Sequence, residues 1–402
     1  MEEILSKLYE MTAFGGFSYQ VALMWVIAFV LLYLGIKKKY EPLLLVPIAF
    51  GVLLANFPGG GMGIVPAENI ALEGHRYKNL FEIASEYGIM NYLYYSLIKT
   101  GFLPPIIFMG VGALTDFGPM LRNLKLAFFG AAAQIGIFTV LIAALLLGFT
   151  LEEAASLGII GGADGPTAIY TTIKLAPHLL GPIAIAAYSY MALVPVIIPL
   201  VANLLISKKE FKINMRQMDK MYPAKHQIKN LKVVKIIFPI ILGCVSAVFV
   251  PSSVPLLGML LFGNLIKEIG TSTLRLSEAA TGPIMNTATI FLGLTVGATM
   301  TADVFLSAKT LGIVVGGFVA FAISIAGGIL AVKVYNLFAK KKINPLIGAT
   351  GLSAVPMASR VANEMALKHD SNNHILQYCM ASNISGVIGS AVAAGVLISL
   401  LS

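Results

Sequence analysis

Long apolar segments separated by short polar loops run from residue 19 to the end of this 402-residue chain. A bilayer core about 30 Å thick needs roughly 20 apolar residues in a spanning helix, within a range of about 17–25. The segments that approach this length are 19–36, 42–57, 101–119, 126–150, 179–206, 233–250, 254–266, 283–302, 310–337 and 375–400, of which the second and the seventh are short. The pattern therefore predicts an all-α polytopic membrane protein with about ten spanning helices.

Two further apolar segments, 156–176 and 344–360, are interrupted by Gly and Pro and are not typical of continuous helices. Irregular backbone at membrane depth is tolerated only where it is buried in protein or lines a wet cavity. We therefore expect two broken, re-entrant segments. The predicted organisation is an N-terminal amphipathic segment over 1–18, a first membrane half over 19–206, a basic loop over 207–235 and a second membrane half over 236–402.

Charged residues make up only 12% of the chain, about half of the roughly 25% found in soluble domains. The net charge of +9 comes from basic residues in short loops beside apolar segments, which indicates membrane topology rather than nucleic-acid binding. Lys37–Lys39, Arg122 with Lys125, Lys340–Lys342 and the loop 207–235 can all be cytoplasmic, which places both termini outside. The loop either only anchors this topology or also docks a soluble partner. The expected location is the cell (inner) membrane.

The two membrane halves share a sequence pattern. The first reads IFMGVGALTDF (107–117) and, after a long apolar segment, LGIIGGADGPTAI (157–169); the second reads IFLGLTVGATMTADVF (290–305) and then NPLIGATGLSAVPMASR (344–360). In the predicted topology the broken segments enter from opposite sides. Such an inverted repeat is typical of secondary transporters, whose broken helices meet near the midplane and form the binding site. The alternative is chance similarity between Gly- and Ala-rich segments.

Asp164, in the GGADGP sequence, is the leading candidate for chemistry. A charged group at membrane depth costs about 2.5–3.5 kcal/mol on insertion scales, so it indicates function. Asp before Gly-Pro-Thr also suits a helix N-cap, and both roles can hold at once. A carboxylate, carbonyls and hydroxyls form an all-oxygen ligand set that suits a hard cation such as Na⁺.

Other polar residues of the second half could complete such a site. Ser353, Asn344 and Asn383 offer neutral oxygens, although helix–helix hydrogen bonds would also explain them. Arg360 is either an interfacial residue or a bidentate partner for a carboxylate. The Tyr190 phenol could pass a proton, or the ring could be a packed aromatic with a bonded hydroxyl.

The chain resembles the membrane β subunit of the biotin-dependent, sodium-translocating decarboxylases, which act on oxaloacetate, methylmalonyl-CoA or glutaconyl-CoA. The matching blocks are GIIGGADGPTAIY (158–170), SYMALVPVIIP (189–199), FLGLTVGAT (291–299), NPLIGATGLSAVPMASRVAN (344–363) and the NISGVIGSAVAAG run that begins at 383. The resemblance extends from about residue 20 to the end. It departs in GATG (348–351), where some relatives are expected to carry an Asn.

The resemblance implies a mechanism in which carboxybiotin is decarboxylated with uptake of a proton while Na⁺ is exported. It implies catalytic roles for Asp164, Tyr190, Ser353 and Arg360, biotin binding by Arg360 and Asn344, and Na⁺ binding by Asp164, Asn344, Gly348, Ser353 and Asn383. Implied partners are a biotin carrier subunit, a soluble carboxyltransferase α subunit, a small single-span γ/δ subunit and further copies of the chain.

Two other functions fit the same residues. A secondary Na⁺-coupled carboxylate transporter without catalytic activity would share the inverted repeat and Asp164. A membrane anchor that only docks soluble subunits would have no use for an intramembrane carboxylate, so Asp164 argues against it.

Overall fold

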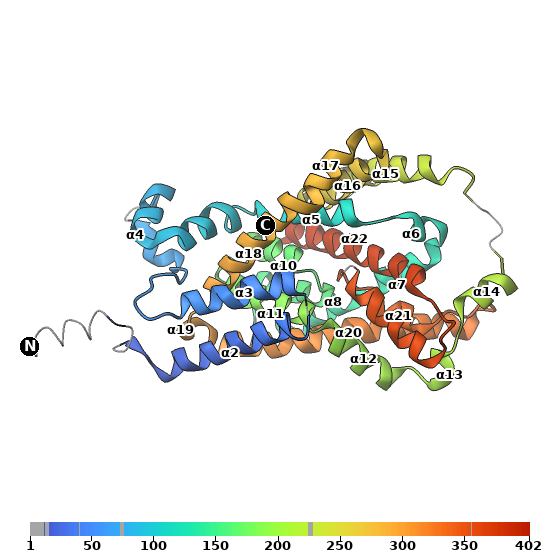
Figure 1. Ribbon diagram of the computed structural model, residues 1–402, viewed down its shortest axis with the longest axis horizontal. Coiled ribbons are helices and arrows are strands. Elements are labelled where there is room, and N and C mark those ends of the chain that lie inside the picture. The colour runs from blue at the N-terminus through green and yellow to red at the C-terminus, as the bar shows by residue number, and fades with distance from the viewer. Residues whose placement is uncertain (1–11, 13–15, 40, 73–75, 224–227, 355) are drawn as a thin grey trace, which may run out of the picture. The chain divides into compact units, whose positions relative to one another are not determined.

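Helices account for nearly all of the regular structure in the computed structural model, which describes residues 12, 16–39, 41–72, 76–223, 228–354 and 356–402 (Figure 1). The remainder is a two-residue antiparallel ladder of β1 (Ala71–Leu72) and β2 (Arg76–Tyr77). Among the described residues, seven helices are long and apolar enough to cross a membrane, or up to nine if each of two bent pairs counts as one span. The all-α, multi-pass fold is confirmed, with a span count close to the predicted ten. Most of the predicted N-terminal segment 1–18 lies outside the described residues.

The chain divides into two compact units. Unit 1 comprises residues 1–103 and 286–314, and unit 2 comprises residues 104–285 and 315–402. Both re-entrant segments predicted from the sequence therefore fall in unit 2.

Unit 1 is built around a tight pairing of apolar helices. Its elements are α2 (Tyr19–Ile36), α3 (Pro42–Ala55), η2 (Ala67–Ile70), α4 (Leu80–Leu93), the π-helical η3 (Tyr94–Ile98), most of α18 (Met285–Ala298) and α19 (Ala302–Phe305). A Cβ on Gly51 of α3 would lie only 2.3 Å from the Leu294 carbonyl oxygen of α18, so glycine permits this backbone contact. The short α3 ends at Asn56, whose side-chain amide donates to the Met300 carbonyl at 2.7 Å.

Unit 2 contains the remaining helices. They are α5 (Leu103–Leu114), α6 (Gly118–Arg122), α7 (Leu124–Ala133), α8 (Ile135–Leu146), α9 (Leu151–Gly158), η4 (Ile159–Gly162), α10 (Gly165–Leu175), η5 (Pro177–Leu179), α11 (Leu180–Ala192), α12 (Val194–Leu205), α13 (Lys208–Phe211), α14 (Met215–Met221), α15 (Leu231–Phe249), η6 (Pro251–Ser253), α16 (Val254–Ile269), η7 (Thr271–Thr273), α17 (Leu274–Ala279), the π-helical η8 (Ala280–Ile284), most of α20 (Ala308–Phe338), η9 (Pro345–Thr350), α21 (Met357–His369) and α22 (Leu376–Leu401).

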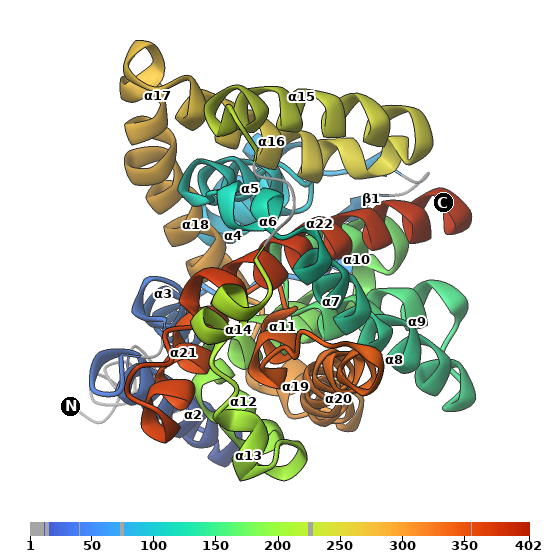
Figure 2. The same ribbon diagram turned by 90° about the vertical axis from the view of Figure 1, so that its right-hand side faces the viewer.

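The C-terminal helix α22 is the centre of unit 2. It packs on α7, α10 and α21, and Figure 2 shows it in red running past all three. Its buried face is rich in small residues, including Ser382, Gly386 and Ser390. Small residues let helix backbones approach closely in a membrane, where van der Waals packing drives association. The C-terminal helix is thus placed against both broken segments.

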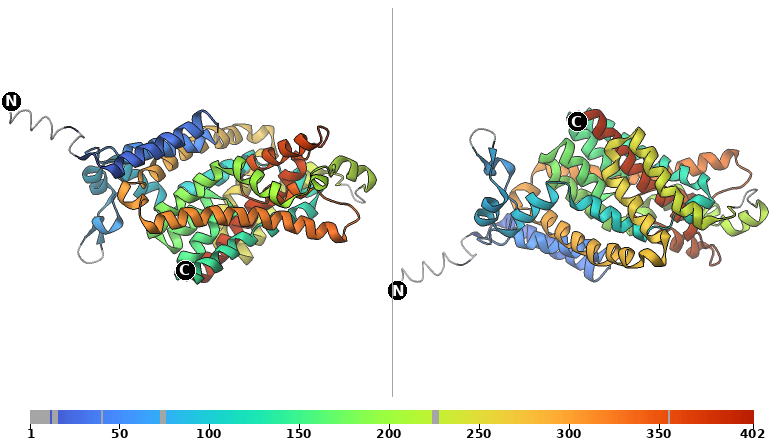
Figure 3. Two further views of the ribbon diagram at one scale, coloured as in Figure 1. Left: turned by 90° about the horizontal axis from the view of Figure 1, so that it is seen from below. Right: turned by 90° about the horizontal axis from the view of Figure 1, so that it is seen from above.

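Both interrupted segments predicted from the sequence are present. In the first, α9 and η4 are followed by an irregular turn and then by α10. In the second, η9 is followed by an irregular turn and then by α21. The preceding helix α20, by contrast, is one continuous 31-residue helix, drawn in orange in Figure 3. Breaks therefore occur where Gly and Pro cluster between polar residues, and not merely where Gly is frequent.

The two interrupted segments begin at opposite ends of the α11–α12 pair. In the first, Glu153 near the start of the segment contacts His178 just after its end, with Glu153 Oε1 2.8 Å from His178 Nε2. His178 lies just before α11 begins. The second begins at Asn344, whose side-chain amide donates to the Phe211 and Ile213 carbonyls just after α12 ends. This arrangement agrees with the inverted repeat predicted from the sequence.

A contact between two glycines provides a test of this packing. A Cβ on Gly328 of α20 would lie 2.1 Å from the Gly348 carbonyl oxygen of η9. We expect Gly328→Ala to lower the free energy of unfolding in detergent by about 1–3 kcal/mol, because the added methyl group forces the segments apart. Gly316→Ala is the matched control, since a Cβ on Gly316 of the same helix would have no atom within 4 Å. Equal thermal stability of the two variants would contradict this role of Gly328.

Candidate functional site

The first break is produced by the sequence GGADGP. Ala163 adopts the left-handed conformation with φ +56°, which ends η4 after Gly162. Asp164 then becomes the N-cap of α10, and Pro166 occupies the first turn, where no intrahelical N–H donor is needed. The predicted capping role of Asp164 is confirmed.

The Asp164 carboxylate is buried and accepts hydrogen bonds from two directions. Its side chain is only 4% exposed. Oδ1 accepts from the Thr167 amide at 3.1 Å, and Oδ2 accepts from the Ser390 hydroxyl at 2.8 Å. Burial disfavours the charged form, whereas the cap, the positive end of the α10 dipole and the hydroxyl favour it. The carboxylate therefore lies where a proton or a cation can compensate its charge.

Ser390 connects this carboxylate to the second break. Its hydroxyl lies 2.7 Å from the Ser353 hydroxyl. A serine hydroxyl has one proton, so if Ser390 donates to Asp164 it must accept from Ser353. In addition, the Ser353 amide donates to the Gly162 carbonyl at 3.1 Å. The two breaks thus meet directly, and the structure brings Asp164 and Ser353 together as the sequence predicts.

Asn383 holds the backbone of the second break. Its side-chain amide donates to the Thr350 carbonyl at 3.2 Å and also to the Leu352 carbonyl. Ser390 lies seven residues later on α22, two helical turns along the same face. The same buried face of α22 therefore supplies the amide that supports the second break and the hydroxyl that reaches Asp164.

Each long helix before a break also bonds to the break of the other half. Ser324 of α20 donates to the Gly161 carbonyl of the first break at 2.6 Å. Gln134, between α7 and α8, donates to the Gly351 carbonyl of the second break at 3.2 Å. These crossed hydrogen bonds satisfy carbonyl groups that a broken helix leaves without intrahelical partners.

The tyrosine beside the first break is Tyr188. A Cβ on Gly165 would lie 2.4 Å from the Tyr188 ring, so the ring packs directly on the start of α10. The predicted Tyr190 is buried against α20, with its ring centroid 6.1 Å from that of Phe318 and 6.5 Å from that of Phe321. The structure thus places Tyr190 on the α20 side of α11, and Tyr188 against the α10 side.

Three other predicted residues lie outside the junction of the breaks. The Asn344 amide is occupied by the Phe211 and Ile213 carbonyls, and its oxygen caps η9 at the Leu346 amide. Gly348 packs its carbonyl against Gly328. Arg360 is exposed on the first turn of α21. Asn344 therefore holds the second break to the 207–235 loop, and Gly348 packs it against α20.

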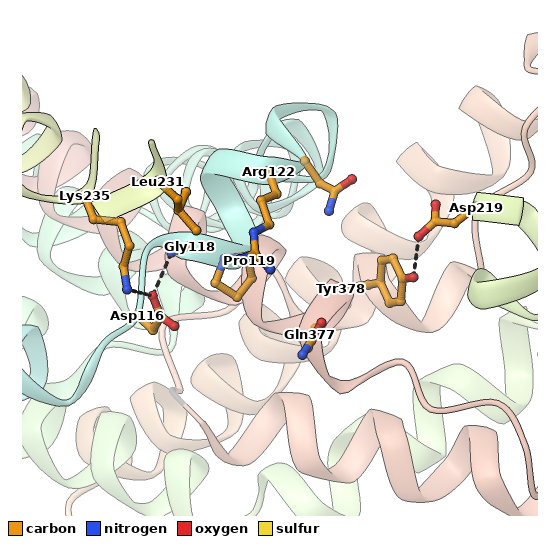
Figure 4. A pocket seen from close by; sticks show the side chains of 10 residues that line it. Asp116, Gly118, Pro119, Arg122, Asp219, Leu231, Lys235, Gln377 and Tyr378 are labelled. Carbon is orange, nitrogen blue, oxygen red and sulfur yellow. Dashed lines mark hydrogen bonds and ion pairs between the residues drawn. The ribbon is translucent and has the colours of Figure 1, made fainter. Parts of the chain in front are cut away.

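A separate cavity of about 350 Å³ opens near the start of α22. Its lining residues come from α6, α14, α15 and α22 and from the turns beside them: Asp116, Gly118, Pro119, Arg122, Asn123, Asp219, Leu231, Lys235, Gln377 and Tyr378 (Figure 4). Lys235 Nζ forms an ion pair with Asp116 Oδ1 at 2.8 Å, and the Tyr378 hydroxyl donates a hydrogen bond to the Asp219 carboxylate. Figure 4 marks both contacts with dashed lines. Burial raises the pKa of Asp116, but hydrogen bonds from Lys235 and the Gly118 amide outweigh it and hold the pKa below its usual value.

Sequence reasoning missed three residues of the site: Ser390, Tyr188 and Gln134. Ser390 sits in a run of small residues, and only its two-turn spacing from Asn383 places it on the same helix face. Gln134 is an uncharged polar residue within an otherwise apolar segment, a signal that could have been used. The choice between Tyr188 and Tyr190 depends on how α11 is rotated, which the sequence pattern does not reveal.

The chain is similar to known proteins over nearly its whole length. Residues 20–401 match the family model described as the Na⁺-transporting oxaloacetate decarboxylase beta subunit. The chain belongs to this family.

The chain is similar to several curated relatives over nearly the full length of each. The chain is 48% identical to the methylmalonyl-CoA decarboxylase subunit beta of Propionigenium modestum, with 100% of both chains covered. It is 44% identical to the oxaloacetate decarboxylase beta chain of Klebsiella pneumoniae, with 94% of both covered. It is 45% identical to the methylmalonyl-CoA decarboxylase subunit beta of Veillonella parvula, covering 97% of this chain and 96% of the relative. The resemblance identified from the sequence blocks is confirmed.

The contact between Ser390 and Asp164 can be tested by stability. We expect Ser390→Ala to lower the free energy of unfolding in detergent by about 1–3 kcal/mol, because Asp164 Oδ2 loses its buried donor. Ser399→Ala is the matched control, since that serine is exposed on the same helix and its hydroxyl donates only to the Ser252 hydroxyl, in an exposed hydrogen bond. Its loss should change stability by less than about 0.5 kcal/mol. If both variants unfold at the same temperature as the unmodified protein, Ser390 does not support the carboxylate.

Proposed function

We propose that this protein is the membrane subunit of a sodium-pumping decarboxylase. It decarboxylates carboxybiotin with uptake of a proton, and it couples this reaction to Na⁺ export. Family membership supports the decarboxylase role. The observation that carries the proposal is the buried Asp164 carboxylate, which lies where the two broken segments meet.

The Na⁺ site is built around Asp164. The available groups are the Asp164 carboxylate, the Ser353 hydroxyl and the Asn383 amide oxygen. These are hard oxygen ligands, which suit Na⁺ better than a soft transition metal. Asn344 and Gly348, which the resemblance also assigns to the site, act here by holding the second break in place.

The proton path uses the same carboxylate. The hydrogen-bonded series Ser353–Ser390–Asp164 can pass a proton from one oxygen to the next without exposing a charge to lipid. Decarboxylation of N-carboxybiotin breaks the bond between the ring nitrogen and the carboxyl carbon, releases CO₂ and leaves a nitrogen that takes one proton. The Asp164 carboxyl group, once protonated, therefore supplies the proton that the reaction consumes.

Ion and proton movement are coupled because both compete for Asp164. A cation beside the carboxylate favours its ionised form, and departure of the cation favours protonation. A bound Na⁺ that leaves toward the outside is thus replaced by a proton. Uncoupled leak is avoided when the site opens to one side at a time, through a shift between two conformations.

Carboxybiotin is presented by a biotin carrier partner and enters from the side of the basic loop. The cavity of about 350 Å³ near the start of α22 has a size that suits a small bicyclic ligand. It is lined by Tyr378, five residues before Asn383 on the same helix. Arg360, on the first turn of α21 after the second break, contributes a carboxylate-binding cation. A carboxyltransferase α subunit, a small single-span subunit and further copies of this chain complete the proposed complex.

The role of Asp164 can be tested with the purified subunit in liposomes. We expect Asp164→Asn to abolish both Na⁺-dependent CO₂ release from carboxybiotin and ²²Na⁺ transport, because the amide cannot exchange Na⁺ for a proton. Glu152→Gln is the matched control, since Glu152 lies on the same interrupted segment, on the first turn of α9, and should retain both activities. Sodium-stimulated turnover by Asp164→Asn would exclude the proposed mechanism, and ²²Na⁺ transport without CO₂ release by the unmodified protein would favour a simple carboxylate transporter.

Arg360 gives a second test. Its guanidinium is exposed, so Arg360→Gln should leave thermal stability unchanged. We expect the variant to raise KM for free carboxybiotin about tenfold or more, because a bidentate carboxylate contact is lost. Arg275→Gln, at an exposed arginine on α17, is the control and should not change KM. An unchanged KM in Arg360→Gln would remove Arg360 from the carboxybiotin site.

A further inference from the structure

Gln134 occupies an unusual position for an amide side chain. It lies between α7 and α8, at the C-cap of one helix and the N-cap of the next, and it is only 6% exposed. The surrounding segment 126–150 is otherwise strongly apolar. A buried polar group in such a segment needs partners for both its donor and its acceptor atoms.

The neighbouring carbonyl groups determine how the amide is oriented. Gln134 Nε2 lies 3.2 Å from the Gly130 carbonyl oxygen, 3.2 Å from that of Gly351 and 3.4 Å from that of Gly386. An amide oxygen in this place would face three acceptors, so the nitrogen must occupy it. Oε1 therefore faces the other way, where a Cβ built on Gly162 would lie 3.6 Å from it.

No group in the described part of the chain donates a hydrogen bond to Gln134 Oε1. Asn383 shows the same pattern, because its amide nitrogen binds two carbonyls of the second break while Oδ1 has no donor among the described residues. A buried acceptor without a donor costs about 1–3 kcal/mol. A cation compensates such oxygens without needing a proton.

We propose that Gln134 Oε1 is a further ligand of the transported cation, on the side of the first break that adjoins Gly162. This inference rests on the proposed function and adds a residue from the α7–α8 junction to the site. A cation at Oε1 polarises the amide and strengthens the hydrogen bonds that its nitrogen donates to Gly351 and Gly386. Occupancy near the first break is thereby transmitted to the backbone of the second.

The alternative is that Gln134 only clamps the backbone, as Ser324 does in the other half. Ser324 donates its single proton to the Gly161 carbonyl. The two roles predict different behaviour of Gln134→Met and Gln134→Glu. Methionine removes both the oxygen and the donor, whereas glutamate keeps an oxygen and loses the donor.

The experiment measures thermal unfolding of the purified subunit in detergent while Na⁺ is titrated at constant ionic strength. We expect Gln134→Met to raise the apparent Kd for Na⁺ about tenfold or more. Gln134→Glu should not raise Kd, because a carboxylate oxygen remains to bind the cation. Ser324→Ala, the clamp control, should lower the Na⁺-free Tm and leave Kd within about threefold. If Gln134→Met does not fold, Gln134→Asn, whose side chain is one methylene shorter, withdraws the oxygen and should also raise Kd.

Two results would overturn the inference while leaving the proposed function intact. One is an unchanged Kd in Gln134→Met with Na⁺ stabilisation abolished in Asp164→Asn. The other is an equal loss of Na⁺ affinity in Gln134→Met and Gln134→Glu, which would show that only the donor matters. A lack of any Na⁺ stabilisation of the unmodified protein would instead reject the proposed function and, with it, the ligand role of Gln134.

Discussion

A buried carboxylate that must be compensated at membrane depth constrains the rest of this structure. Asp164 is removed from water, so its charge needs donors, a cation or a proton. The Thr167 amide and the Ser390 hydroxyl supply the donors. Ser390 of the last helix also contacts Ser353 of the second break. The same hydroxyl that stabilises the Asp164 carboxylate therefore holds the two breaks and the last helix together.

The second constraint comes from backbone carbonyl groups in the two breaks that have no hydrogen-bond partner within a helix. Each break leaves carbonyl groups that lipid cannot satisfy. The structure satisfies them mainly with side chains from other helices: Ser324 for Gly161, Gln134 for Gly351, and Asn383 for Thr350 and Leu352. The polar residues scattered through these apolar helices thus have a shared purpose, which is to hold irregular backbone at the site.

Close packing makes these hydrogen bonds possible. Glycines at the contacts let backbone meet backbone, as where Gly328 meets Gly348, and where a Cβ on Gly386 would lie 2.2 Å from the Gly351 carbonyl. Interfaces packed this closely rearrange as units and do not deform continuously. The same interfaces that stabilise the site therefore also limit how it can move.

The sequence by itself determined the all-α membrane fold, the two broken segments and the position of Asp164 at the cap of the first break. Apolar run length, Gly/Pro interruptions and an isolated intramembrane charge are local signals, so they can be read without the fold. Only the tertiary structure decided that Ser390 links Asp164 to Ser353, that Tyr188 is the tyrosine beside α10, and that Gln134 reaches the opposite break. Those contacts depend on how helices far apart in the chain are rotated and paired. Helices that are apolar on all sides have little hydrophobic periodicity, so their sequences do not predict that rotation or pairing.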